Sequence, residues 1–362
     1  MASVVQIAVQ PDPSRVHPEE RAALLENPEF GKVFTDHMVT AKWTAERGWH
    51  DAEVRARGPF ALDPAAAVLH YAQEIFEGLK AYRCADGAIV LFRPEENARR
   101  FALSADRMAM PVVPEALFLE AVEALVQTDR DWIPDGEGTL YLRPFMFATE
   151  AFLGVRPASE YMFCLIASPV GAYFKGGAKP IKVWVPEVFS RAAPGGTGAA
   201  KCGGNYAASL LAQAEAIRNG CDQVAFLDAA RHRWIEELGG MNIFFVMTDG
   251  SVITPPLGGT ILPGVTRSSV LTLARDAGLA VDERAYSFRQ FQDDAQSGAL
   301  REAFACGTAA VIAAIGEVRY AAGAFTIANG GTGAVTTRLR EELVGLQRGL
   351  VEDRHGWIRR VG

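Results

Sequence analysis

The sequence predicts a two-domain chain in which helices and sheets are mixed, part α+β and part α/β. Its 362 residues are more than one ordinary domain holds. Hydrophobic residues make up 49% of the chain and charged residues 22%, as in globular proteins with a large core. A stretch with proline and several glycines, 168–178, interrupts the helical and strand patterns. We therefore expect a small α+β domain over 1–167, an inter-domain loop over 168–178, and a larger β-rich domain with helices over 179–362.

The overall charge, the hydropathy and the cysteines argue against several classes of protein. A formal net charge of −7 argues against nucleic-acid and membrane-surface partners, which require basic patches. The chain has no run of about eighteen apolar residues and no cationic-then-apolar N-terminus, so we expect no membrane span, no signal peptide and a cytoplasmic protein. Five scattered cysteines without a C-x-x-C pair, and six histidines without ligand spacing, predict reduced thiols and no metal site.

The first half alternates strand and helix patterns. Helix-forming residues predict a helix at 65–76, which Glu77-Gly78 would end. Asp86-Gly87 between two apolar runs predicts a hairpin. Proline followed by acidic residues predicts a helix start at Pro94. The remaining elements expected in this half are strands 34–43, 79–83, 88–92, 139–147 and 161–167 and helices 94–103 and 114–126.

Strand-like runs and two helix entries fill the second half. Strong helix formers after Tyr206 predict a helix over 207–217. Thr266 is the expected N-cap of a second helix. The remaining elements expected here are strands 179–185, 223–228 and 234–247 and a small-residue turn between apolar runs at 303–312.

The glycine-rich stretch from Gly195 to Tyr206 is the most unusual part of the chain. It holds five glycines, Lys201 and almost no bulky apolar residue, and it leads into a predicted helix. Such a backbone can approach a ligand closely, and a helix N-terminus suits an anion. A phosphate-binding P-loop matches poorly, because Ala200 replaces its last glycine and Cys202 its magnesium-binding hydroxyl. A surface loop with a solvated lysine and a lysine that forms a Schiff base both stay open.

Other side chains have both a structural and a functional interpretation. Arg100 is either a solvated helix cation or the counter-charge of an anion. Tyr141 and Arg143, two apart on one strand face, either receive a carboxylate or form an amphipathic face. Glu236 and Glu237, beside two glycines, are either exposed at a bulge or buried against a cation. Four aromatic residues either pack in the core, which is the commoner location for such residues, or line a binding pocket. They are Phe30, Tyr71, Phe76 and Tyr173.

Two turns in the second half expose backbone N–H groups beside a hydroxyl. They are the helix entry at Val265-Thr266 and the turn at Gly307-Thr308-Ala309. With Arg100 as counter-charge they would form a phosphate site, although ordinary helix caps look the same locally.

Taken together and in order, these features resemble the class IV, or fold type IV, pyridoxal-phosphate-dependent aminotransferases. The branched-chain amino acid aminotransferases are the closer match, and similarity extends from about residue 30 to the C-terminal helix. The class-wide motifs are matched by Glu237, Asn242-Ile243-Phe244, Val252-Ile253-Thr254 and Leu262–Arg267. The branched-chain motifs are matched by Phe34–Met38, Phe76–Ala81, Lys201–Tyr206 and Ala305–Ala310.

The resemblance implies a role for each candidate residue. Lys201 would carry pyridoxal 5′-phosphate as a Schiff base, Tyr206 would bind the phenolic oxygen of the cofactor, and Glu237 would pair with its pyridine nitrogen. Glu237, rather than Glu236, has the expected spacing to Asn242. The phosphate would be held by Arg100, Val265, Thr266 and Thr308. The substrate would be held by Phe30, Tyr71, Phe76, Tyr141, Arg143, Tyr173, Thr308 and Ala309.

The resemblance also implies a reaction and an assembly. Such an enzyme exchanges amino groups between L-leucine, L-isoleucine or L-valine and 2-oxoglutarate, with Lys201 moving the proton. Family members are homodimers, and the region near Phe152–Leu153 would reach into the partner's site. Some carry a C-x-x-C redox switch, which is not expected here because Ala310 and Ala313 occupy its positions. The alternatives are a D-amino acid aminotransferase, an aminodeoxychorismate lyase, a nucleotide-binding protein and a non-catalytic binding protein.

Overall fold

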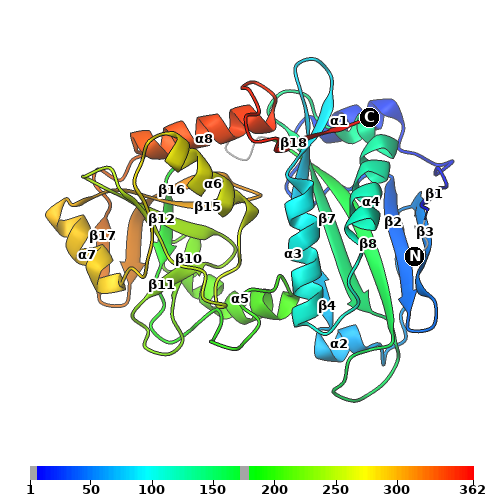
Figure 1. The fold of residues 1–362 in the computed structure, drawn as a ribbon, viewed down its shortest axis with the longest axis horizontal. Helices are drawn as coiled ribbons and strands as arrows, with labels where there is room; N and C mark the ends of the chain where they lie inside the picture. Colours follow the sequence, from blue (N-terminus) through cyan, green and yellow to red (C-terminus); the bar gives the residue numbers. More distant parts are fainter. Residues whose placement is uncertain (1–5, 172–178) are drawn as a thin grey trace. The chain divides into compact units, whose positions relative to one another are not determined.

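The chain divides into two compact units in the computed structural model, which describes residues 6–171 and 179–362 (Figure 1). The first unit consists of residues 1–173, 200–203 and 346–362, and the second of 174–199 and 204–345. The chain therefore returns to the first unit twice after leaving it. The domains predicted from the sequence contain neither return.

A sheet of nine strands, counted over the described residues, forms the centre of the first unit. Its order is β1-β3-β2-β8-β7-β5-β6-β18, and β4 pairs with β7 beside this path. The pairing is antiparallel except between β1 and β3. The five predicted strands of this half are confirmed. The bounds are β1 (Ala8–Val9), β2 (His37–Thr44), β3 (Gly48–Ala56), β4 (Glu74–Phe76), β5 (Leu79–Arg83), β6 (Ile89–Phe92), β7 (Thr139–Ala148), β8 (Glu160–Val170) and β18 (Ile358–Val361).

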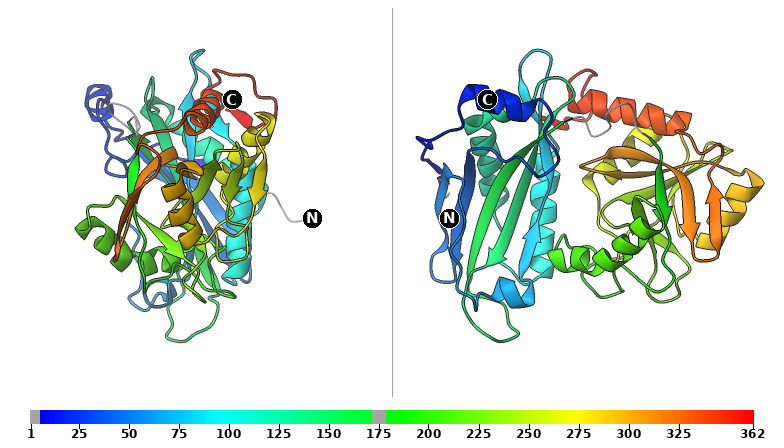
Figure 2. Two further views of the ribbon diagram at one scale, coloured as in Figure 1. Left: turned by 90° about the vertical axis from the view of Figure 1, so that its left-hand side faces the viewer. Right: turned by 180° about the vertical axis from the view of Figure 1, so that it is seen from behind.

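Two long helices, α3 (Pro94–Arg107) and α4 (Glu115–Thr128), lie against this sheet (Figure 2). Phe101 of α3 packs edge-on against Phe163 of β8, with 5.8 Å between ring centroids. The same buried face of α3 carries Arg100 and Ser104, so the core contact also fixes these two polar side chains. The smaller helical elements of the unit are α1 (Pro18–Leu25), α2 (Ala67–Tyr71) and the 3₁₀ turn η1 (Arg130–Trp132).

The helix predicted over 65–76 is wrong in its second half. Helix α2 ends at Tyr71, and Ala72 adopts a left-handed conformation with φ of 48°. Residues Glu74–Phe76 then pair with Phe145–Phe147 of β7. This pairing buries Ile75 completely and gives the backbone sheet partners, which overrides local helix propensity.

The loop predicted to begin at residue 168 begins later, because β8 continues to Val170. Pro169 does not break the strand. β2 pairs with β8 only as far as Leu165, whereas β7 pairs with it as far as Val170. Pro169 therefore has a ladder partner on one side only, where a missing N–H is tolerated. Residues 172–178 of the predicted loop lie outside the described residues.

The second unit is built on another sheet, again of nine strands within the described residues. Its order is β11-β10-β9-β16-β15-β12-β13-β14, and β17 pairs with β16. β11 also pairs with β12, so the sheet from β11 through β12 closes into a ring. The predicted strand 234–247 is split in two by a turn at Gly239-Gly240. The bounds are β9 (Ile181–Trp184), β10 (Gln223–Leu227), β11 (Ile235–Leu238), β12 (Asn242–Met247), β13 (Val252–Thr254), β14 (Val281–Glu283), β15 (Leu300–Gly307), β16 (Val311–Tyr320) and β17 (Gly323–Thr326).

The helices of this half are α5 (Gly203–Arg218), α6 (Val265–Asp276), α7 (Phe288–Ser297) and α8 (Ala334–Gln347), and both α6 and α7 pack against β15. The prediction that Thr266 caps α6 is wrong. Gly264 is the N-cap, and Thr266 is the second helical residue and buried. A side chain at 264 would collide with the amide of Asn242, which explains the glycine there. None of the described helices has both the length and the apolar composition that a membrane crossing requires.

Candidate active site

The segment that carries Lys201 is held by hydrogen bonds inside the first unit. The Lys201 amide donates to Ser104 Oγ on α3 at 2.9 Å, and the Lys201 carbonyl accepts from the Phe76 amide at 2.9 Å. Two residues on, the Gly203 amide donates to the carboxylate of Glu74. Helix α3 and strand β4 therefore hold this backbone from two directions, unlike a flexible surface loop. Sequence reasoning named neither Ser104 nor Glu74.

The surroundings of the Lys201 amine favour its uncharged form on balance. Its Nζ is 4.8 Å from the centroid of the Phe76 ring. Burial, followed by the nearby positive charge of Arg100, lowers the pKa of Lys201 to about 8, while the carboxylate of Glu77 opposes this shift. An amine that loses its proton near neutral pH can act as a nucleophile and as a base.

Arg100 is buried, and its partner is the fully buried Glu77. Arg100 Nε donates to Glu77 Oε1 at 2.6 Å, and Nη2 donates to Oε2 at 2.9 Å. Burial alone would raise the pKa of Glu77, but the charge and hydrogen bonds of Arg100 outweigh it and hold that pKa below its ordinary value. The solvated-helix interpretation of Arg100 is wrong, because tertiary packing of α3 turns this face inward.

Four of the predicted substrate residues come together in the first unit. Arg143 Nη2 donates to the Tyr141 hydroxyl at 3.1 Å, and the guanidinium lies 4.9 Å from the Phe76 ring centroid. The Phe30 ring meets Tyr141 edge-on at 5.0 Å. The Tyr141 hydroxyl occupies the place of a side chain at Gly78, so this position requires glycine. The result is an aromatic wall with one cation.

A fifth predicted substrate residue, Tyr71, lies in a different kind of environment. Tyr71 ends α2 and is exposed, with its ring beside that of His70. Tyr173 lies outside the described residues.

In the second unit, Glu237 on β11 is buried among donors. Arg191 Nη2 lies 2.6 Å from Glu237 Oε1, and both side chains are 4% exposed. The Leu262 amide donates to the same oxygen at 2.8 Å, and Asn242 Nδ2 donates to Oε2 at 3.1 Å. Asn242 lies opposite Glu237 in the β11–β12 register, which is the spacing that singled out Glu237. The expected exposure of this acid is therefore wrong, although the register of β10 with β11 does shift beside it, as at a bulge.

Arg191 is the main residue of this site that sequence reasoning missed. Besides Glu237, its Nη2 donates to the carbonyls of Gly198 at 2.8 Å and Thr260 at 2.6 Å. Arg191 thus ties the glycine-rich stretch to the strand that carries Glu237. The only available signal was physical, since a buried carboxylate requires a cation somewhere in the fold.

Glu236, the neighbouring acid, has a different environment. Its Oε1 accepts from the Thr260 hydroxyl at 2.5 Å, and Oε2 is buried without a hydrogen-bond partner. Burial raises the pKa of Glu236 in spite of the Thr260 bond and the charge of Arg191. The two adjacent acids therefore have different partners, since Glu237 contacts Arg191 and Glu236 contacts Thr260.

Several other predicted cofactor residues gather near Glu237. Gly264, the N-cap of α6, abuts Asn242, so Val265 and Thr266 begin their helix beside this pair. The turn at Thr308-Ala309 follows β15, whose Cys306 is opposite Asn242. The Cβ position of Gly240 is 3.8 Å from the Tyr206 ring. Four segments therefore bring different groups to one end of the sheet of the second unit. These groups are a helix N-terminus, a turn with backbone N–H groups, a phenol and a carboxylate.

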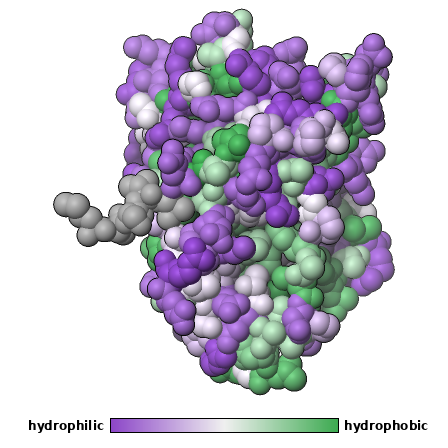
Figure 3. Space-filling model, turned by 90° about the vertical axis from the view of Figure 1, so that its right-hand side faces the viewer, coloured by the Kyte–Doolittle hydropathy of each residue, from purple (hydrophilic) through white to green (hydrophobic). Residues whose placement is uncertain are grey.

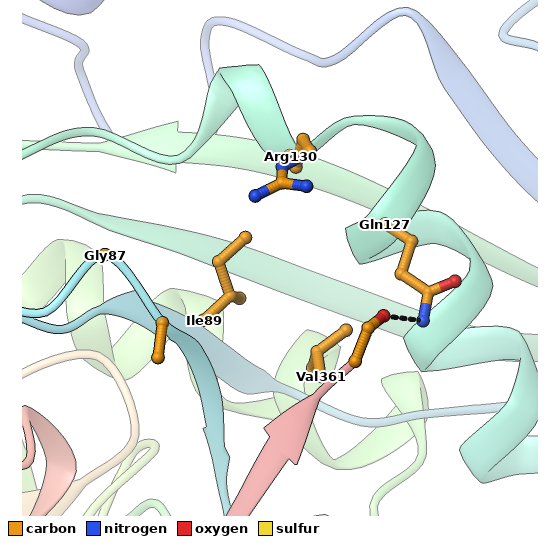
Figure 4. A pocket seen from close by; sticks show the side chains of 7 residues that line it. Gly87, Ile89, Gln127, Arg130 and Val361 are labelled. Atoms are coloured by element: carbon orange, nitrogen blue, oxygen red, sulfur yellow. Dashed lines mark hydrogen bonds between the residues drawn. The ribbon is translucent and has the colours of Figure 1, made fainter.

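A pocket elsewhere in the first unit contains none of the predicted site residues. It measures about 250 Å³ and lies between the β5–β6 turn, the end of α4 and the C-terminus (Figure 4). Gln127 closes one side by donating to the Gly362 carbonyl at 2.5 Å. Across residues 6–171 and 179–362, no three histidine, cysteine, aspartate or glutamate side chains form a metal-binding group.

Comparisons with known proteins place this arrangement in context. The model of one protein family, described as amino-transferase class IV, matches residues 74–318. The chain is 56% identical to a probable branched-chain-amino-acid aminotransferase of Streptomyces coelicolor, over 97% of this chain and 98% of the relative. Its fold is similar to the solved branched-chain amino acid aminotransferase of Escherichia coli, with a TM-score of 0.76 and 29% identity over 90% of this chain and 99% of that one. The T.th. branched-chain amino acid aminotransferase, solved in complex with N-(5′-phosphopyridoxyl)-L-glutamate, has a TM-score of 0.72 and 28% identity over 89% of this chain and 98% of that one.

Proposed function

The chain belongs to the class IV aminotransferases, and from this premise we propose that it transfers amino groups between L-leucine, L-isoleucine or L-valine and 2-oxoglutarate. It is a pyridoxal-phosphate-dependent branched-chain amino acid aminotransferase. The proposal of 2-oxoglutarate as the acceptor draws support from the phosphopyridoxyl-glutamate in complex with the T.th. enzyme. The observation that carries the proposal is the positioned amine of Lys201, with a pKa of about 8.

The donor set fits pyridoxal phosphate. An aldehyde requires an amine, a phosphate requires a cation and N–H groups, and a protonated ring nitrogen requires a carboxylate. We assign the covalent bond to Lys201, the ring nitrogen to Glu237 and the phenolic oxygen to Tyr206. The phosphate is assigned to Arg100, Val265, Thr266 and Thr308.

Bound pyridoxal phosphate supplies an electron sink that stabilises the negative charge left when a proton departs from the substrate Cα. Lys201 would carry that proton between the substrate Cα and the C4′ carbon of the cofactor, and its lowered pKa leaves more of the amine unprotonated near neutral pH than an ordinary lysine would have. Arg191 and Asn242 hold the Glu237 carboxylate in place, so that it can pair with a cationic ring nitrogen.

One pocket must accept an aliphatic side chain from one substrate and a carboxylate from the other. Phe76 and Phe30 offer apolar walls, and the Tyr141–Arg143 pair offers a hydroxyl and a guanidinium at one edge. Because Arg143 stacks on Phe76, its charge can face a carboxylate while its plane stays against an apolar surface. The α-carboxylate is assigned to the backbone amides at Thr308-Ala309.

A homodimer is the proposed assembly. Apolar side chains gather over the lower part of the face drawn in Figure 3. The connection between β7 and β8 carries Leu153, 75% exposed, and Val155, 93% exposed, and Leu69 on α2 is 58% exposed. Apolar side chains this exposed favour burial against a partner. A Leu153→Asp/Val155→Asp variant is expected to elute as a monomer in light-scattering chromatography, and an unchanged dimer would contradict this use of the connection.

The decisive experiment is a survey of half-reactions. The purified protein is expected to be yellow, and L-leucine, L-isoleucine, L-valine and L-glutamate should each convert its absorbance to that of the amine form of the cofactor. Borohydride treatment should fix the cofactor to the Lys201 peptide, as read by mass spectrometry.

Controls separate the alternatives within and outside the class. Lys201→Ala should bind cofactor without a covalent bond and lose transamination, and full activity in this variant would refute the mechanism. Conversion by D-alanine or aminodeoxychorismate, but not by L-leucine, would favour one of the other class IV activities. Nucleotide binding that survives saturation with pyridoxal phosphate would support a different class of protein.

A further inference from the structure

Beyond these assignments, we infer that Glu77 is a positioning residue, which aims the guanidinium of Arg100 at the phosphate of the cofactor. The inference rests on the proposed function, because it presupposes that Arg100 binds that phosphate. The hydrogen bonds that carry this role are made by the Glu77 carboxylate with protein groups.

The contacts of Glu77 leave its carboxylate a single orientation. Arg100 Nε and Nη2 approach its two oxygens as a fork, at 2.6 and 2.9 Å. Oε2 also accepts from Asn97 Nδ2 at 2.8 Å and from the Gly78 amide at 3.0 Å. Asn97 precedes Arg100 by one helical turn on α3, so both donors come from one face of that helix. A fully buried carboxylate with four donors has no alternative rotamer of similar energy.

Glu77, which contacts Arg100, is joined by one peptide bond to Phe76, which contacts Lys201. The preceding residue, Phe76, donates its amide to the Lys201 carbonyl, and its ring lies under the Lys201 amine. Residues 76 and 77 therefore hold, side by side in the sequence, the backbone of the proposed covalent residue and the side chain of the proposed phosphate ligand. A rigid dipeptide of this kind sets the distance between the two ends of one cofactor.

Glutamine at position 77 tests orientation without changing size. A carboxylate accepts from both N–H groups of the fork, whereas an amide has one acceptor and one donor. Asn97 and Gly78 require an acceptor at the Oε2 position, so the glutamine NH₂ would face Arg100 Nε. Two donors in contact would push the guanidinium out of its orientation.

The direction in which Glu77→Gln changes phosphate binding shows whether Glu77 orients Arg100 or only neutralises its charge. Removal of a negative charge beside Arg100 strengthens phosphate binding if only long-range electrostatics matter. Loss of the fork weakens phosphate binding if orientation matters, because anion recognition by arginine depends on its planar geometry.

The test compares two ligands on the cofactor-free full-length protein. Binding constants for pyridoxal phosphate and for pyridoxal, which lacks the phosphate, are measured by absorbance titration, and their ratio isolates the phosphate contribution. We expect Glu77→Gln to reduce this ratio about tenfold, the size of one lost charge-assisted hydrogen bond. Glu123→Gln, which removes a carboxylate from Arg359 on the same unit, is the matched control and should leave the ratio unchanged.

A double-mutant cycle decides whether Glu77 acts through Arg100. In an Arg100→Met background, Glu77→Gln should cause no further change in the ratio. An unchanged or increased ratio in Glu77→Gln alone, or an independent effect in the Arg100→Met background, would overturn the inference and leave the proposed function standing. A wild-type protein that binds both ligands equally would refute the phosphate role of Arg100 and, with it, this inference.

Discussion

Replacement of Arg191 by methionine would leave the carboxylate of Glu237 buried without its cation. The two side chains are each 4% exposed and their closest N–O distance is 2.6 Å. Removal of one partner of such a buried pair costs about 3–5 kcal/mol of folding free energy. The carbonyls of Gly198 and Thr260 would lose the same donor, which places the expected loss towards the upper end of that range.

The assay is chemical denaturation of the cofactor-free protein at one fixed protein concentration, for a cycle of four proteins. These are the wild type, Arg191→Met, Glu237→Gln and the double variant. Because the double variant removes both charges, it should be more stable than the sum of the single losses, by about 2–3 kcal/mol of coupling. The reasoning is refuted if Arg191→Met costs less than about 1 kcal/mol, or if the two losses add within about 0.5 kcal/mol.

Four further outcomes are expected. Gly203→Ala places a Cβ against the Glu74 carboxylate and should lower kcat about tenfold or more by displacing the Lys201 segment. The control is Gly204→Ala, whose Cβ meets no atom within 4 Å and whose kcat should stay near that of the wild type. Equal effects of the two substitutions would contradict this expectation. In the cofactor-free protein, modification of Lys201 by an amine reagent, followed by mass spectrometry, should show a midpoint near pH 8 because burial and Arg100 lower its pKa to about 8, and a midpoint near the ordinary 10.5 would disprove this. The unfolded chain keeps that proton up to about pH 10.5, so the same shift makes the folded state more stable, relative to Lys201→Ala, as pH rises from about 8 to 10.5. A chain that ends at Asp353 loses β18 and the bonds of Arg359 to Glu95 and Glu123, and its calorimetric unfolding temperature should fall further than that of Arg359→Ala, which keeps the strand.

Local patterns predicted most of the elements, because their causes are local. The Asp86-Gly87 turn, the proline-led start of α3 and the β-forming residues of β7 can each be recognised within a short stretch of sequence. The errors at β4 and at the end of β8 share one cause, which is pairing with distant residues. Glu74–Phe76 became a strand because β7 accepted it, and Pro169 stayed in β8 because only one neighbour strand reaches it.

The candidate site divides in the same way. The spacing from Glu237 to Asn242 singled out one of two adjacent acids, and the structure pairs those residues across β11 and β12. The carboxylates and hydroxyl that hold the site, Glu77, Glu74 and Ser104, were not given a role in it from the sequence, because their partners are far away in the chain. No periodicity of a single segment links Glu77 to Arg100, or Ser104 to Lys201.

The sequence by itself determined the kind of chemistry, because residue types and their spacing limit what a site can do. A lysine among glycines, an acid five residues before an asparagine, and two turns rich in N–H groups were present before any fold was known. The tertiary structure alone decided the charge state and aim of these groups. Burial lowers the pKa of Lys201, Arg191 compensates Glu237, and Glu77 orients Arg100. These effects depend on desolvation and on distances of a few ångströms between residues that only folding brings together.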